Sequence, residues 1–85
     1  MSQTVLEEAQ AVITGPRHEA FGDAEESFGA IASGWASILG IEVTPRDVAL
    51  CMVWLKVVRE SHSHQRDNLI DICGYAALAD QLAAD

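Results

Sequence analysis

The chain has 85 residues, of which 49% are hydrophobic, and a formal net charge of -8 at pH 7. This length supports one domain at most, so we assign residues 1–85 to a single domain. The acidic balance argues against nucleic acid and anionic membrane surfaces as partners, because both are bound through basic patches. No apolar run reaches the roughly 18 residues of a membrane span. The N-terminus has no signal-peptide pattern, so we expect a cytoplasmic protein.

Two helices are predicted in the first half of the chain. Thr4 and Glu7 have the spacing of a capping box, and apolar residues at helical spacing follow to about Ile13. Asp23 and Glu26 repeat the capping pattern after an irregular stretch. The helix that follows has the clearest apolar stripe in the chain, formed by Phe28, Ile31, Ala32, Trp35, Ile38 and Leu39.

The second half predicts a pair of antiparallel helices. Thr44 and Asp47 form another capping box, and the helix that they begin is apolar on nearly every side from Val48 to Val58. Residues 61–65 interrupt the pattern, and a last helix is predicted from about Arg66 to Ala83. Because the connection is short, these two helices should pack antiparallel. The predicted fold class is therefore all-α, a small bundle of about four helices.

Two features predict that oligomerisation completes this bundle. The helix that follows Thr44 has more apolar surface than one short chain can cover. The preceding helix also has a stripe of small residues, which is either a solvent-facing surface or a close helix crossing: Ala30, Ser33, Ser37 and Gly40. We therefore expect a homo-oligomer, with a dimer favoured. In it, Trp35 and Trp54 should be buried in the core or at the interface.

Three of the five basic residues lie between Lys56 and Asp71. Folding the chain at about Ser63 places Arg59 opposite Asp67 and Lys56 near Asp71. One interpretation is two inter-helix salt bridges that fix the register of the hairpin. In the other, Asp67 and Asp71 hold a divalent metal such as Mg²⁺. Lys56 and Arg59 would then hold an anionic group such as a phosphate.

The segments "RHEAFGDAEESF", "IASGWASILGIEVTPRDVALCMVWLKVVR" and "HQRDNLIDICGYAAL" together resemble a family of small proteins encoded by tailed bacteriophages, especially those of actinobacteria. The resemblance implies a phage-encoded protein in the host cytoplasm, and the family has no assigned activity. The acidic N-terminal half and the absence of a complete catalytic motif favour a non-structural accessory protein. Phe21 and Ser27 stand where the family pattern has Tyr and Asn. We predict that seven side chains matching the pattern converge on one site: Arg17, Asp23, Lys56, Arg59, Asp67, Asp71 and Tyr75.

A weaker resemblance is to the all-α nucleotide pyrophosphohydrolases, which bind Mg²⁺ through Glu-Glu-x-x-Glu and Glu-x-x-Asp motifs. Glu7 and Glu8 lack the third Glu of the first motif, and Asp67 and Asp71 are four residues apart rather than three. Two functions are therefore left open. One is binding, either of a host protein or of a small anionic ligand, and the other is a Mg²⁺-dependent nucleotide pyrophosphohydrolase or nucleotide-binding protein.

Overall fold

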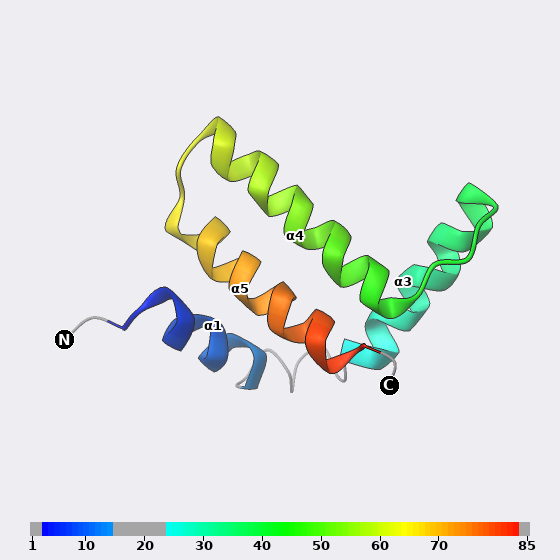
Figure 1. Ribbon diagram of the computed structural model, residues 1–85, viewed down its shortest axis with the longest axis horizontal. Coiled ribbons are helices and arrows are strands. Elements are labelled where there is room, and N and C mark those ends of the chain that lie inside the picture. The colour runs from blue at the N-terminus through cyan, green and yellow to red at the C-terminus, as the bar shows by residue number, and fades with distance from the viewer. Residues whose placement is uncertain (1–2, 15–23, 84–85) are drawn as a thin grey trace.

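The computed structural model describes residues 3–14 and 24–83, and within these ranges the only regular elements are four α-helices (Figure 1). They are α1 (Val5–Thr14), α3 (Ala24–Leu39), α4 (Pro45–His62) and α5 (Arg66–Gln81). The all-α prediction is confirmed. None of the helices in these ranges is long and apolar enough to cross a lipid bilayer.

The predicted helix starts at Thr4 and Thr44 are confirmed as capping boxes. The Glu7 N–H donates to Thr4 Oγ1 over 3.1 Å, and the Thr4 N–H donates back to Glu7 Oε1 over 2.9 Å. The corresponding distances between Asp47 and Thr44 are 3.1 and 3.0 Å. Two donors at each helix start, which have no partner inside the helix, are satisfied in this way. The third predicted cap, at Asp23, lies outside the described residues.

The C-terminal ends follow their sequence signals less closely. Gly40 follows α3 with a positive φ of 71°, the left-handed conformation that glycine adopts without a steric penalty. In contrast, α4 does not end before residue 61 as predicted. It continues to His62, because the Ser63 N–H still donates to the Arg59 carbonyl over 3.0 Å. The Ser61 hydroxyl is also satisfied locally, by donating to the Val58 carbonyl.

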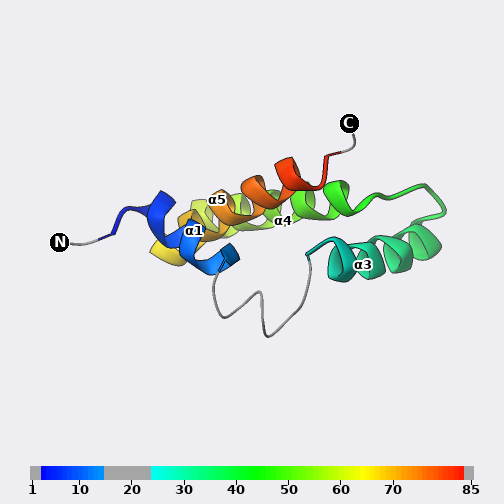
Figure 2. The same cartoon turned by 90° about the horizontal axis from the view of Figure 1, so that it is seen from below.

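The α4–α5 hairpin is the centre of the molecule, with α1 packed on α5 and α3 packed on α4 (Figures 1 and 2). Gly74 of α5 is buried, and a Cβ there would lie 3.7 Å from the Ile13 side chain of α1. Arg66 fixes the other end of α1 by pairing with Glu8 and donating to the Gln3 carbonyl over 2.8 Å. The predicted antiparallel hairpin is thus present, and α1 lies against one side of it.

The buried apolar residues of the described chain are mostly small. They are Ala9, Ala32, Val48, Ala49, Ile70 and Ala79, and the largest fully buried side chain among them is Val48. Small residues let the helices approach closely, but they remove little apolar area from water. Trp54, by contrast, is 68% exposed, so its predicted burial in the core of the subunit is wrong. Its predicted place at an interface is not tested by a single chain.

The capping box at Thr44 predicts a specific loss of stability. Thr44→Ala should lower the free energy of unfolding by about 1 kcal/mol, because the Asp47 N–H loses its acceptor. Thr44→Ser keeps a hydroxyl at this position and should stay within a few tenths of the parent. Urea unfolding followed by circular dichroism measures both, and equal stability of the Ala and Ser variants would contradict the cap.

Candidate functional site

The polar contact predicted between Lys56 and Asp71 is present. Lys56 Nζ on α4 lies 2.7 Å from Asp71 Oδ2 on α5, with 15% and 25% of the two side chains exposed. A pair this sheltered from solvent is screened less than a surface ion pair. It therefore ties the middle of α4 to the middle of α5 in a fixed register.

The second predicted pair, Arg59 with Asp67, is wrong. Both residues are exposed, and no ion pair between them occurs in the described part of the chain. At this end of the hairpin the contacts with the start of α5 are made by Glu60, four residues after Lys56, whereas the Arg59 side chain is exposed.

Glu60 replaces Arg59 as the polar contact at the end of the hairpin. Its Oε1 accepts hydrogen bonds from the Gln65 N–H over 3.0 Å and from Asn68 Nδ2 over 3.2 Å. Its Oε2 contacts His64 Nδ1. These hydrogen bonds, with that to His64 the strongest, lower the pKa of Glu60 below its usual value. The carboxylate thus closes the α4–α5 connection.

The two predicted metal ligands have different surroundings. Asp71 is paired with Lys56, and Asp67 is exposed in the first turn of α5. Among the described residues no group of three or more His, Cys, Asp or Glu side chains is arranged to hold a metal ion. Metal binding by the two aspartates stays a prediction.

The predicted convergence of seven residues is present only in part. Lys56 and Asp71 meet as predicted, but Arg17 and Asp23 lie outside the described residues. Tyr75 is half-buried, and its ring stacks on Phe28 of α3 with the ring centroids 6.1 Å apart and the planes 29° from parallel. The contact of Tyr75 is thus an aromatic one that connects α5 to the start of α3.

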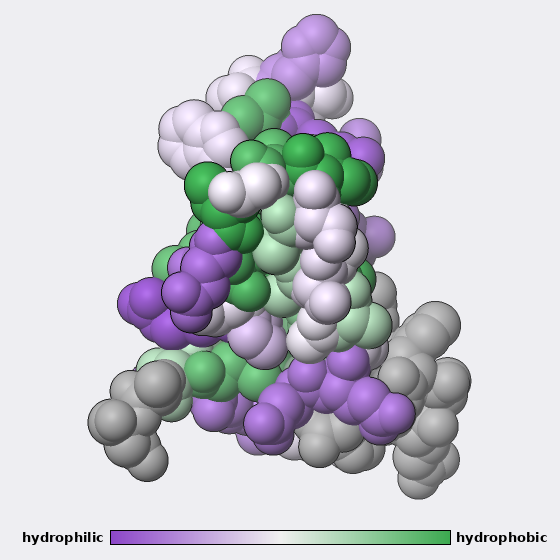
Figure 3. Space-filling view, turned by 90° about the vertical axis from the view of Figure 1, so that its right-hand side faces the viewer, coloured by the Kyte–Doolittle hydropathy of each residue, from purple (hydrophilic) through white to green (hydrophobic). Residues whose placement is uncertain are grey.

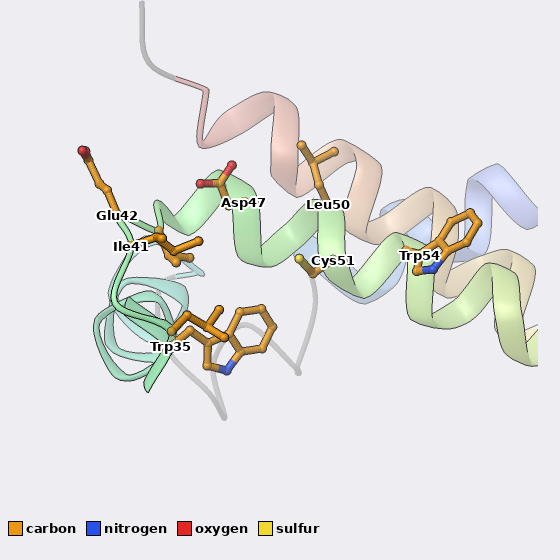
Figure 4. Close-up of a pocket in the computed structure, with 9 residues that line it drawn as sticks. Trp35, Ile41, Glu42, Asp47, Leu50, Cys51 and Trp54 are labelled. Carbon is orange, nitrogen blue, oxygen red and sulfur yellow. The ribbon is translucent and has the colours of Figure 1, made fainter. Parts of the chain in front are cut away.

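The structure also has an open groove between α3 and α4, of about 470 Å³, that the sequence did not reveal. Its walls are mainly apolar (Figure 4), and it is lined by Trp35, Leu39, Ile41, Glu42, Val43, Asp47, Leu50, Cys51 and Trp54. Trp35 comes from α3 and Trp54 from the middle of α4, while Glu42 points away from the groove in Figure 4. The available signal was the helix after Thr44, which is apolar on all sides.

The groove belongs to a wider apolar surface, which we call the α3–α4 face and define by its exposed large side chains. Viewed from the end where α3 meets α4, hydrophobic side chains form a patch across the molecule between hydrophilic regions (Figure 3). Leu39 and Ile41 are each 61% exposed. The other members of the face are Ile31, Ile38, Leu50, Trp54, Leu55, Val57 and Val58.

Residues 4–83 match a protein family described as "Domain of unknown function (DUF6378)". The chain is 39% identical over 82 residues to the "Gene 55 protein" of Mycobacterium phage L5, an alignment that covers 93% of this chain and 52% of the relative. It is 35% identical over 83 residues to the "Gene 55 protein" of Mycobacterium phage D29, covering 96% and 55%. The chain thus spans about half the length of these relatives. No solved structure matches it.

These matches confirm the resemblance to a phage protein family. They carry no support for the resemblance to nucleotide pyrophosphohydrolases.

The Lys56–Asp71 pair predicts an asymmetric response to substitution. Lys56→Met should lower the free energy of unfolding by about 1–3 kcal/mol, because a sheltered carboxylate loses its partner. Exchanging the two residues, Lys56→Asp with Asp71→Lys, should restore most of that loss. Arg46→Met, at an exposed basic residue of the same helix, is the control and should change stability by less than about 0.5 kcal/mol. Chemical denaturation measures all three, and a Lys56→Met variant as stable as Arg46→Met would refute the role of the pair.

Glu60 predicts a pH dependence of stability. Because its folded pKa is lowered, its stabilising contribution is present above the unfolded pKa of about 4.3 and is lost as pH falls through the folded pKa. Glu60→Gln should therefore melt at a lower temperature than the parent at pH 7, and the gap should narrow below about pH 4. Melting temperatures from pH 7 to 3 give the result, with Glu26→Gln on the exposed side of α3 as control. A gap that stays constant with pH is incompatible with the hydrogen bonds of Glu60.

Proposed function

Because the chain belongs to the family described as "Domain of unknown function (DUF6378)", and its matched relatives are mycobacteriophage proteins, we propose that it is a phage-encoded, non-structural accessory protein that acts by binding. It works as a helical oligomer in the host cytoplasm, and its contacts are with protein. The observation that carries this proposal is the α3–α4 face.

The size and composition of the α3–α4 face favour protein contact. Nine of the ten large hydrophobic side chains that are exposed in the described residues lie on α3, α4 or the segment between them, and exposed apolar surfaces of this kind mark interaction sites. Trp54 at 68% exposure is the type of residue that dominates the energy of protein interfaces when it is covered. Contact between this apolar surface and water is unfavourable in free energy, and a protein partner that covers the surface removes that contact.

A small anionic ligand is less well supported by the geometry than a protein partner. Lys56 is already neutralised by Asp71, and Arg66 pairs with Glu8. The groove itself is mainly apolar, none of the nine residues that line it is basic, and the charged ones at its edge, Glu42 and Asp47, are acidic. Acidic side chains repel phosphate groups, so this groove suits apolar side chains of a protein rather than a nucleotide.

The alternative is a Mg²⁺-dependent nucleotide function that uses Asp67 and Asp71. Thermal unfolding with Mg²⁺ and a panel of nucleoside mono-, di- and triphosphates separates it from binding, because a ligand at a hundredfold excess over its Kd stabilises by about 3 kcal/mol. We expect no stabilisation beyond that of Mg²⁺ alone and no release of phosphate or pyrophosphate. A nucleotide that stabilises the parent but not an Asp67→Asn, Asp71→Asn variant would overturn the proposal in favour of the alternative.

The direct test of protein binding uses two variants that add one negative charge at equally exposed positions. Trp54→Glu alters the α3–α4 face at a residue that is 68% exposed, and Leu6→Glu alters α1 at a residue that is 70% exposed. Analytical ultracentrifugation of each purified variant measures whether its chains associate with one another. The parent and Leu6→Glu should associate, and Trp54→Glu should not. Equal behaviour of the two variants would show that the face is not the binding surface.

A further inference from the structure

The outer side of α4 has an apolar stripe that its own chain does not cover. Residues spaced three and four apart share one side of a helix. On α4 this spacing gives Cys51, Trp54 and Val58, with Leu50, Leu55 and Val57 beside them, and all six are exposed. Lys56 is the only charged residue from 48 to 58, and it is turned inward to Asp71. The stripe therefore has no charge along its length.

The area of this chain indicates how much surface is missing. A compact monomer of 9.2 kDa exposes about 4,900 Å², whereas this chain exposes 6022 Å². The excess of about 1,100 Å² is larger than the roughly 800 Å² that each partner contributes to a stable protein interface. The chain therefore exposes enough additional surface to form one side of an ordinary interface.

The arrangement of α3 leaves space for such a surface. α3 packs on α4 near its N-terminal end, and the C-terminal part of α4 extends well beyond it (Figures 1 and 2). One end of the stripe is therefore flanked by α3, and the other end is bare. A suitable partner would cover the bare end of the stripe with one of its own helices. In return, α3 of this chain would cover the corresponding bare end of the partner.

We propose that the occupant of the α3–α4 face is a second copy of this chain. The outer stripes of the two α4 helices pack antiparallel about a two-fold axis close to Trp54. α3 of each copy then covers the bare C-terminal part of the other copy's α4. Two-fold dimers are the commonest soluble oligomers, and their interface uses the same patch on both subunits. Self-association names the partner at the face that the proposed function uses for binding, and it rests on the proposed function only in that respect.

Charge complementarity favours the antiparallel arrangement over a parallel one. Asp47 and Arg59 lie six residues on either side of Val53, near the two ends of the stripe. Antiparallel packing about the middle of α4 brings Asp47 of one copy to the level of Arg59 of the other, twice by symmetry. Arg59 is exposed and has no ion-pair partner within the described residues, so it is available for this contact. Parallel packing would place like charges side by side.

Light scattering of the purified chain after size exclusion, at micromolar concentration, tests the proposal. The expected mass is twice the 9.2 kDa of one chain, and a mass of one chain at every concentration overturns it. Trp54→Glu should give one chain, and Leu6→Glu, with a matched exposure and the same added charge, should remain a dimer. A dimeric Trp54→Glu variant would assign the interface to another face and so refute this geometry.

Fluorescence provides a second measurement that needs no disruptive variant. With Trp35→Phe, Trp54 is the only tryptophan. Its emission should lie at short wavelength in the dimer and move to longer wavelength as dilution exposes it to water. Emission that stays at long wavelength at all concentrations overturns the covered stripe, even if Trp54→Glu fails to fold.

The apolar dye 1-anilinonaphthalene-8-sulfonate separates failure of this inference from failure of the proposed function. If the parent is a monomer that binds the dye and the Trp54→Glu variant does not bind it, self-association is refuted but the α3–α4 face remains a binding surface. If the parent is one chain and Trp54→Glu changes neither dye binding nor association, both proposals fail.

Discussion

The close packing of small residues between α4 and its neighbours is the constraint on which the rest of the structure depends. Val48 and Ala49 are fully buried, and the other buried apolar residues are mainly alanines. The buried positions are thus filled mainly by small side chains, whereas nine of the ten exposed large hydrophobic side chains lie on α3, α4 or the segment between them. The α3–α4 face is the surface that this packing leaves uncovered within the described residues.

Polar contacts add register to this packing rather than a separate site. Lys56 and Glu60 share the side of α4 that meets α5, and each has its partner there. Arg66 does the same between α5 and α1. The basic residues near the hairpin are therefore mostly neutralised within the chain. The acidic net charge is left to the outer surface, where it favours solubility but not contact with phosphates.

Local sequence signals predicted the helices well because their causes are local. The capping boxes at Thr4 and Thr44, and the glycine after α3, involve residues within four positions of one another. The Lys56–Asp71 contact followed from the short connection between α4 and α5. The Arg59–Asp67 prediction was wrong because opposite positions in a hairpin do not guarantee that both side chains lie on the facing sides.

The groove and the exposure of Trp54 were not predictable in the same way. An apolar helix shows only that it must be covered, not whether the cover comes from its own chain. That depends on how far α3 overlaps α4, which is set by the three-dimensional arrangement of the 40–44 connection and not by periodicity. The contact between Phe28 and Tyr75 likewise joins residues far apart in sequence. Tyr75 was therefore assigned to a polar site when its neighbour is an aromatic ring.

Protection of Cys51 tests most directly whether protein covers the α3–α4 face. This thiol is exposed and lines the groove, whereas Cys73 is half-buried on α5 and serves as an internal reference. Labelling with a maleimide, followed by peptide mass spectrometry, gives the rate at each cysteine as a function of protein concentration. The account predicts that Cys51 reacts slowly at high concentration and accelerates on dilution, while the rate at Cys73 changes little. A Cys51 that reacts as fast as a free thiol peptide at every concentration would contradict it.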